Sequence, residues 1–336
     1  MNRILGPVRG VLLALLVCLH TLFFGVIIFA IMPLKFLTWG RVRSRVVQAM
    51  EWVAHRCWCA FNGWLLRHLT PTRWTIRGTD KLRRDRSYLL IANHLSWNDL
   101  FAMMVAFTDR VPPYKIFIKQ QLIWLPVVGQ VVWAIDFPFM KRYTREQIAA
   151  DPSLVGRDVE TTRRMFARYG DRQVTIFNFV EGTRRTPAKH AAQQSPYKHL
   201  LKPRAGGVSY AIRAIGEKLD AVLDVTFYYV NGPWTTWDLF CGRIPEIIVD
   251  ARELQAPEAL AAGDHSSDLG TRKAAQRWVA AIWMWCGCCA RKTAVCYILF
   301  LSIGPKLRLW VRGCCSCRLI SDQQFHHHFS GSLCPL

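Results

Sequence analysis

Residues 87–99 read "SYLLIANHLSWND". The first half of this stretch, residues 87–93, is predicted to form a strand, because the apolar run within it is typical of a strand that is buried on both faces of a sheet. Polar side chains begin abruptly after this run, and they include His94 and Asp99, with four residues between them. We therefore predict a buried strand that delivers His94 and Asp99 to a loop at the edge of a sheet.

These two side chains form a pattern that suits acid–base chemistry. A neutral imidazole is a competent base near pH 7, and a carboxylate bonded to its Nδ1–H fixes the tautomer and stabilises the imidazolium. We therefore interpret His94 as a general base and Asp99 as the group that orients it. The alternative is structural, because Ser96, Asn98 and Asp99 are all helix-capping residues and could form a plain N-cap beside a bystander histidine.

A second polar motif, "FVEGTRRT" at residues 179–186, follows another apolar run at 173–179. Arginine binds phosphate in a bidentate manner, and a glycine turn lets backbone amides approach an anion. We predict a phosphate-binding turn, with a solvated basic turn as the alternative. Glu181 could accept a hydrogen bond from a substrate hydroxyl or hold an arginine. The predicted binding residues in this motif are Glu181, Gly182, Thr183 and Arg184.

Strand-like and helix-like segments alternate along the middle of the chain, which predicts an α/β fold, a mixed sheet flanked by helices. Ligands in such sheets bind at loops beyond the strand ends, where both polar motifs lie. Further strands are expected at 74–78, 114–120, 222–230 and 246–253, and helices at 151–169 and 207–218.

The N-terminal region carries an apolar run without a charged side chain at residues 11–34, which we interpret as a membrane-embedded helical segment. A cleaved signal peptide is the alternative, but the run exceeds the typical apolar core of about 7–15 residues and lacks a clear cleavage site. Residues 35–87 then hold twelve Lys or Arg against three acids. Each cation near an anionic leaflet contributes about 1 kcal/mol, so this stretch should press the following domain onto the membrane.

Charge and composition also favour a membrane surface. The chain has a formal net charge of +21, is 51% hydrophobic and contains 14 Trp, a balance that suits a membrane surface or a polynucleotide. The basic excess is densest beside the apolar segment, and no nucleic-acid-binding motif is present. Residues 46–69 mix Trp with Arg, as an interfacial amphipathic helix or an ordinary core helix would.

We predict three regions: a membrane anchor with an interfacial helix (1–68), a catalytic domain (69–285) and a Cys-rich tail (286–336) that is not part of the fold. Eight of the twelve cysteines lie in this tail. A zinc-binding module is the alternative interpretation of the tail. Its cysteines lack paired C-x2-C spacing, and its three consecutive histidines lack H-x3-5-H spacing.

Both motifs resemble the conserved blocks of the lysophospholipid acyltransferase family, the 1-acylglycerol-3-phosphate O-acyltransferases, of the bacterial inner-membrane type. The first block, N-H-x-x-x-x-D, matches residues 93–99, and the third, usually F-P-E-G-T-R, matches 179–184 with Val180 in place of proline. A looser second block, a lysine, an apolar Pro/Gly turn and an arginine, matches Lys119 through Arg142. The proline of the fourth block is missing. The resemblance covers about residues 70–250.

This resemblance implies transfer of a fatty acyl chain from acyl-CoA or acyl carrier protein to the hydroxyl of a lysophospholipid, above all lysophosphatidate to phosphatidate. His94 and Asp99 would be catalytic, and Arg184, with Lys119 and Arg142, would bind the acceptor's phosphate. The expected partners are the acyl donor, with acyl carrier protein among the candidates, and membrane lipids, but no nucleic acid, metal or cofactor. The expected location is the cell inner membrane, with the catalytic domain facing the cytoplasm. The alternative is a membrane-tethered basic module that binds anionic lipid or nucleic acid without catalysis.

Overall fold

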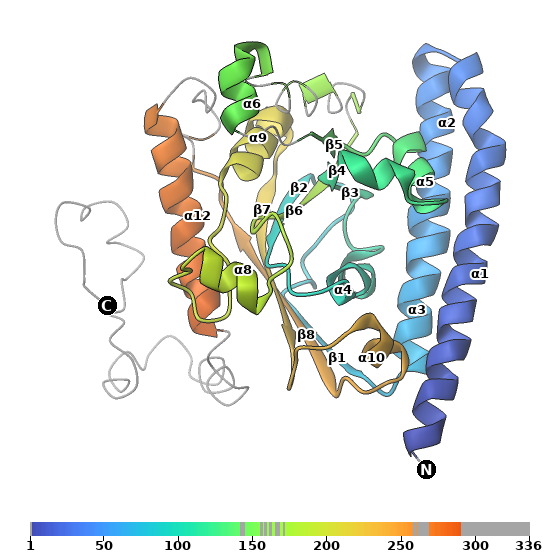
Figure 1. The fold of residues 1–336 in the computed structure, drawn as a ribbon. Helices are drawn as coiled ribbons and strands as arrows, with labels where there is room; N and C mark the ends of the chain where they lie inside the picture. Colours follow the sequence, from blue (N-terminus) through green and yellow to red (C-terminus); the bar gives the residue numbers. More distant parts are fainter. Residues whose placement is uncertain are drawn as a thin grey trace, which may run out of the picture. The chain divides into compact units, whose positions relative to one another are not determined.

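A six-stranded sheet forms the centre of the molecule (Figure 1), in the strand order β1-β8-β7-β2-β6-β3. The computed structural model describes residues 2–289 except 142–144, 155–156, 158–159, 161–162, 165–168, 171, 258–259 and 261–268. Strands β7, β2, β6 and β3 are parallel, whereas β8 runs antiparallel to β7 and pairs in parallel with β1. The predicted mixed sheet is therefore confirmed. Its strands are β1 (Arg73–Arg77), β2 (Tyr88–Ala92), β3 (Tyr114–Ile116), β6 (Thr175–Phe179), β7 (Ala221–Tyr229) and β8 (Glu246–Leu254).

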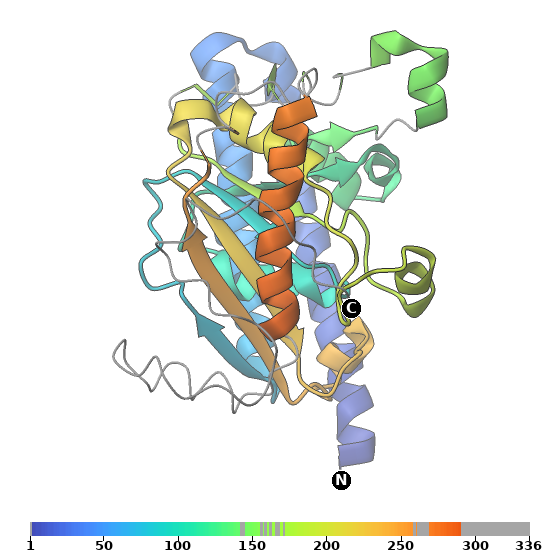
Figure 2. The same cartoon turned by 90° about the vertical axis from the view of Figure 1, so that its left-hand side faces the viewer.

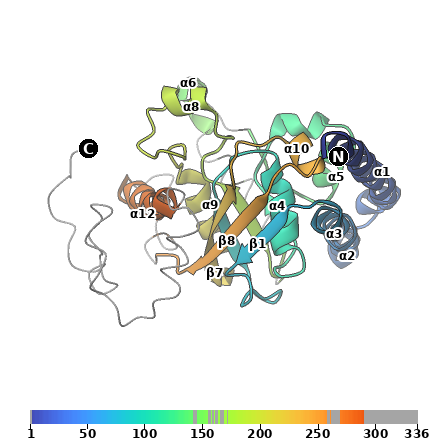
Figure 3. The same ribbon diagram turned by 90° about the horizontal axis from the view of Figure 1, so that it is seen from below.

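Helices cover both faces of this sheet, and β2 shows why its sequence is apolar throughout. Successive side chains of a strand point to opposite faces. Leu90 and Ala92 belong to the hydrophobic cluster that includes α4 (Asn98–Phe107), whereas Leu89 and Ile91 pack in a second cluster on the other face. That second cluster contains residues of α9 (Gly206–Ile215) and α12 (Leu269–Cys289), which lie together on one side of the sheet in Figures 2 and 3.

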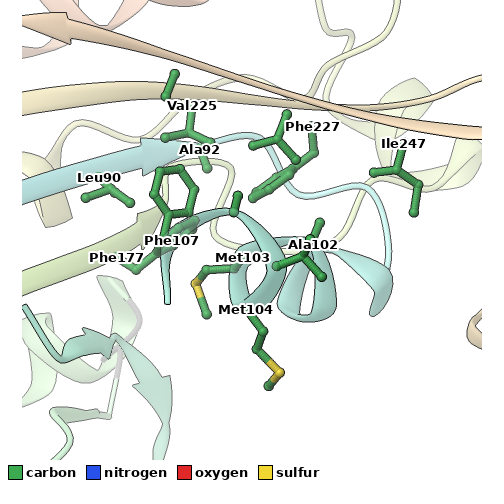
Figure 4. Packing of buried hydrophobic residues seen from close by; sticks show 14 of the residues in the cluster. Leu90, Ala92, Ala102, Met103, Met104, Phe107, Phe177, Val225, Phe227 and Ile247 are labelled. Atoms are coloured by element: carbon green, nitrogen blue, oxygen red, sulfur yellow. The ribbon is translucent and has the colours of Figure 1, made fainter. Parts of the chain in front are cut away.

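The helix α4, which directly follows the first polar motif, is anchored in the larger cluster. Figure 4 shows Met103 and Phe107 of α4 lying against Phe177 and Phe227 of the sheet. The ring centroids of Phe107 and Phe177 are 6.4 Å apart in an edge-on arrangement. Buried aromatic pairs of this kind fix the position of a helix on a sheet, so the start of α4 is held rigidly beside the ends of the strands.

The N-terminal region forms a helical layer outside α4 (Figures 1 and 3). Helix α1 (Asn2–Leu37) packs against α2 (Gly40–Trp52), a π-helical segment (Val53–Cys59) and α3 (Ala60–Leu69). Within the described part of the chain, Leu5–Leu37 is the one helix long and apolar enough to cross a membrane. Residues 46–69 combine both predicted behaviours, because Met50 and Leu66 are fully buried while Trp52 and Trp64 are at least half exposed.

Some segments differ from the prediction. The strand expected at 114–120 is split, because residues after Ile116 leave β6 and form β4 (Ile118–Lys119), which pairs with β5 (Phe139–Met140) in a separate two-stranded sheet. The helix expected at 151–169 begins with a 3₁₀ turn at Pro152–Leu154, and much of its remainder lies outside the described residues. The helix α12 continues to Cys289, past the expected boundary at 285, and residues 290–336 lie outside the described residues. The other helices are α5 (Val128–Ala134), α6 (Arg145–Ala150), α8 (Pro187–Ala192) and α10 (Thr236–Phe240).

Candidate active site

The two polar motifs meet because β2 and β6 are neighbouring parallel strands that end at the same edge of the sheet. Ala92 and Phe179, the last residues of these strands, are register partners. Beyond them, the Val180 N–H donates to the Ala92 carbonyl at 3.2 Å, and the Arg185 N–H donates to the His94 carbonyl at 2.8 Å. The loop that carries His94 is therefore bonded directly to the loop that carries Arg184.

Asp99, in the first turn of α4, organises the loop that precedes this helix, and its side chain is fully buried. Its Oδ2 atom accepts hydrogen bonds from the backbone N–H groups of Leu95 at 2.7 Å and Ser96 at 3.0 Å. The same oxygen lies 2.7 Å from Nδ1 of His94. A carboxylate accepts only, so Nδ1 carries the proton and Nε2 is the nitrogen left for a substrate. One carboxylate thus organises the turn and holds the ring, whereas Trp97, the N-cap residue of α4, makes no side-chain capping bond.

The second oxygen of Asp99 is bound by a residue that the sequence analysis missed. The hydroxyl of Tyr229, at the end of β7, donates to Oδ1 of Asp99 at 2.6 Å. Burial, and then the charge of Asp99, raise the pKa of the Tyr229 hydroxyl well above its ordinary value, so that it stays a donor. The only signal in the sequence was the alternation of β7, which places Tyr229 on the same face as Phe227.

The imidazole of His94 is held by packing and remains partly open. Its ring stacks on Phe179, with centroids 4.1 Å apart and planes inclined by 21°. Its side chain is 17% exposed, in contrast to the fully buried Asp99. The ring is therefore fixed by two neighbours and accessible on one side, as a base that receives a proton from a bound substrate must be.

Next to this ring lies a cationic turn that could bind an anion. Gly182 has φ +68°, a left-handed conformation that favours glycine, and its N–H donates to the Phe179 carbonyl at 2.9 Å. The guanidinium of Arg184 lies over the Trp97 ring, 4.6 Å from its centroid. Lys189, on α8, donates to Thr183 Oγ1 at 2.7 Å and to the Arg184 carbonyl at 3.2 Å. Lys189 was not predicted from the sequence, because it lies outside the motif at residues 179–186.

Glu181 does not lie where the sequence analysis expected. Its side chain is fully buried, and neither carboxyl oxygen has a hydrogen-bond partner of good geometry within the described residues. Burial raises the pKa of this carboxyl to about 9; the charge of Asp99 adds to the rise, while the backbone of Leu201 and His94 opposes it. Near pH 7 the group is therefore protonated and buried, without access to a substrate on the open side of His94.

Of the two residues taken from the loosely matching block, Lys119 is not joined to this site in the described part of the chain. Lys119 is exposed and lies in β4 of the small sheet, and no contact described for it reaches His94 or Arg184. Arg142 lies outside the described residues. The site that the structure assembles therefore consists of His94, Asp99 and Tyr229 on one side, and Gly182, Thr183, Arg184 and Lys189 on the other.

Comparison with known proteins identifies the region that carries this site. Residues 73–230 match the family model described as Acyltransferase. A 1-acyl-sn-glycerol-3-phosphate acyltransferase alpha from Mus musculus is 26% identical over 132 residues, 39% of this chain and 40% of the mouse protein. An uncharacterised acyltransferase of Schizosaccharomyces pombe is 28% identical over 154 residues, 42% of this chain and 41% of its own. The matches thus span about two fifths of the length of these relatives.

Among solved structures, the chain is similar to PlsC, the 1-acyl-sn-glycerophosphate (LPA) acyltransferase from Thermotoga maritima. The sequence identity is 15% and the TM-score is 0.47, over 84% of this chain and 98% of that protein.

The buried Glu181 carboxyl predicts a specific dependence of stability on pH. With its folded pKa raised to about 9, the native protein keeps a proton that the unfolded chain loses above about 4.5, so stability falls as pH rises between these values. Glu181→Gln removes this titration. We expect the melting temperature of the variant, relative to wild type, to be higher at pH 8 than at pH 5.

Thermal unfolding in detergent at the two pH values measures this difference, and any constant cost of burying the amide cancels in the comparison. Glu217→Gln, at an exposed glutamate, serves as the control and should show no such trend. An equal difference between Glu181→Gln and wild type at both pH values would contradict the assignment.

Proposed function

We propose that this chain, which belongs to the acyltransferase family through residues 73–230, transfers a fatty acyl group from a thioester donor to the hydroxyl of a lysophospholipid. The observation that supports this function is the pairing of an oriented base with a cationic turn: His94 is held by Asp99, and its carbonyl is bonded to the backbone of Arg185, next to Arg184. An acceptor that carries both a hydroxyl and a phosphate needs these two groups side by side.

In the proposed reaction, Nε2 of His94 accepts the proton of the acceptor hydroxyl. The acceptor hydroxyl attacks the thioester carbonyl as His94 takes its proton, and the imidazolium is stabilised by the Asp99 carboxylate. The tetrahedral intermediate then expels the thiolate, which recovers the proton from His94, so that an ester and a free thiol are formed. The acceptor itself is the nucleophile, so the scheme needs neither a covalent acyl-enzyme nor a cofactor. The donor is acyl-CoA or acyl carrier protein.

The cationic turn is the proposed binding site for the phosphate of the acceptor. Arg184 offers a planar, permanently charged donor group, which suits phosphate. Lys189 brings a second cation to Thr183 and the Arg184 carbonyl, within the same turn. Lysophosphatidate is the acceptor we propose first, because the mouse relative is named a 1-acyl-sn-glycerol-3-phosphate acyltransferase. Glycerol 3-phosphate and other lysophospholipids carry the same phosphate and remain alternatives.

The proposed setting is the membrane surface, since such an acceptor is embedded in lipid. Helix α1 has 36 residues, about 54 Å at 1.5 Å per residue, against about 30 Å for a bilayer core. It is bordered by protein along its length: α10 lies against Gly10, α5 against Gly25, and Lys35 binds Asp136. The opposite side exposes apolar residues such as Leu19 and Phe23. We therefore propose that α1 lies along one leaflet, with its outer side in lipid.

The basic residues after α1 support an orientation toward the cytoplasm, because such residues are retained on that side of the membrane. For a bacterial cell we propose that the enzyme lies at the inner membrane and faces its donor. The non-catalytic alternative, a basic module for anionic lipid or nucleic acid, accounts for the charge of the chain but gives no reason for a buried carboxylate that orients a histidine.

The first test is acyl transfer from oleoyl-CoA, and separately from oleoyl acyl carrier protein, to lysophosphatidate in membranes. We expect wild type to form phosphatidate and release one free thiol per product, and His94→Ala to lose at least about a hundredfold in rate, the usual scale of general-base catalysis. Equal amounts of inserted protein must be compared. Equal rates for the two proteins would exclude His94 as the base, whereas no acyl transfer by wild type would favour the non-catalytic alternative.

The phosphate-binding turn predicts a different kinetic change. Arg184→Lys keeps the charge but removes the planar donor pair, so we expect KM for lysophosphatidate to rise about tenfold, with a smaller change in kcat. The matched control is Arg185→Lys, since the Arg185 side chain donates to the Lys198 carbonyl instead. A change of the same size in both variants would show that Arg184 has no special role among the arginines of this turn.

Tyr229 predicts a third kinetic change, because it positions Asp99 and does not touch the substrate. Tyr229→Phe removes one hydrogen bond to the carboxylate, and we expect kcat to fall by roughly three- to tenfold while KM for both substrates stays unchanged. Tyr228→Phe, at the neighbouring partly exposed tyrosine, is the control. A rise in KM without a fall in kcat would contradict a role that acts through Asp99.

A further inference from the structure

A second polar cavity lies at the other end of the strands from His94. Its volume is about 230 Å³, and it opens between the first turns of α2 and the residues that precede β6. His94 and Arg184 follow the last residues of β2 and β6, whereas this cavity lies before the first residue of β6, so the two sites are separate. The cavity is lined by Gly40, Arg43, Ser44, Val47, Glu51, Asp136, Tyr169 and Arg172.

Both carboxylates in this lining are already engaged by buried lysines. Lys115 binds Glu51 at 2.9 Å, and neither side chain is more than 5% exposed. Burial opposes ionisation of Glu51, but Lys115 and Arg172 outweigh it and hold the pKa of the carboxyl below its usual value. Asp136 is bound by Lys35 at 2.9 Å. Each carboxylate is therefore paired with a lysine, which leaves the two arginines as the charges that face a ligand.

Arg172 and Arg43 give the cavity a positive excess. The Nη1 atom of Arg172 binds Glu51 at 3.0 Å, but its Nε–H is buried and has no partner within the described residues. The Arg43 side chain is partly exposed, and no acidic partner is described for it. Among the described residues of the lining and their ion-pair partners, two lysines and two arginines stand against Glu51 and Asp136, an excess of two positive charges. A buried donor without a partner, beside unbalanced cations, is a feature of an anion-binding site.

The surroundings of the cavity indicate which anion it binds. It lies at the turn between α1 and α2, where Phe36, Leu37, Trp39 and Val42 are each more than half exposed. Exposed aromatic and apolar side chains beside arginines are typical of the boundary between lipid and water. Pockets for whole drug-sized ligands measure about 300–1,000 Å³, so this cavity suits a single headgroup phosphate and not a nucleotide cofactor.

We propose that this cavity binds the phosphate of one anionic membrane phospholipid through Arg43 and Arg172, and so fixes the turn between α1 and α2 at the membrane surface. The first turn of α2 contributes Gly40 and Arg43 to the lining, and its N-cap residue Trp39 makes no side-chain capping bond. The backbone N–H groups of that turn add to the donors that a phosphate requires. The site is distinct from the acyl-transfer site and does not depend on the reaction proposed for it.

The test is lipid binding by the full-length protein in neutral detergent, counted by native mass spectrometry. The probe is dioctanoyl phosphatidylglycerol, and dioctanoyl phosphatidylcholine serves as the zwitterionic control. Arg43→Gln removes a lining charge, and Ser44→Met fills the cavity without changing the charge. Arg45→Gln is the matched control, since Arg45 is exposed on the same helix and does not line the cavity.

We expect wild type and Arg45→Gln to bind phosphatidylglycerol at one site that Arg43→Gln and Ser44→Met weaken at least tenfold. Lipid that enters the catalytic site is common to all four proteins and cancels in the comparison. Equal binding by Arg43→Gln and Arg45→Gln would overturn the proposal, as would equal binding of phosphatidylcholine. Displacement of the bound lipid by an equal concentration of inorganic phosphate would overturn the lipid assignment and identify a site for soluble phosphate.

Discussion

The buried carboxylate of Asp99 is the constraint on which the candidate active site depends. It accepts from two backbone N–H groups, the His94 ring and the Tyr229 hydroxyl, all within 3.0 Å. A buried charge is costly unless it is satisfied in this way, so the loop after β2, the start of α4 and the end of β7 cannot move apart without exposing it. The same bonds that stabilise the turn therefore hold the imidazole in one tautomer and one orientation.

The parallel sheet supplies the second half of the site. Since β2 and β6 run in the same direction and are in register at Ala92 and Phe179, whatever follows each strand must lie at one edge. This edge carries an oriented imidazole after β2 and a cationic turn after β6. Their separation is fixed by strand spacing and by the bond between the Arg185 N–H and the His94 carbonyl.

The sequence predicted the parts of the fold that depend on local pattern. The apolar runs at β2, β6 and β7 predicted strands, and the two polar motifs correctly indicated one shared site. Tyr229 could not be predicted, because its role depends on β7 lying beside β2, which no local pattern reveals. The burial of Glu181 could not be predicted for a similar reason. A charged residue in a polar motif suggests an exposed side chain, and only the packed structure shows that this one is buried. The early end of β3 could not be predicted from its own residues either, because Ile118 and Lys119 pair with β5 and not with β6.

The most direct test of the account is the activity of Asp99→Asn as a function of pH. The amide keeps the shape of the carboxylate and can still accept from the two backbone N–H groups, but it cannot stabilise an imidazolium. If Asp99 orients the His94 ring and stabilises its imidazolium, the variant stays folded by circular dichroism and its acyl-transfer rate falls roughly a thousandfold or more across the pH range. A folded variant whose rate stays within about tenfold of wild type would show that His94 does not work through Asp99.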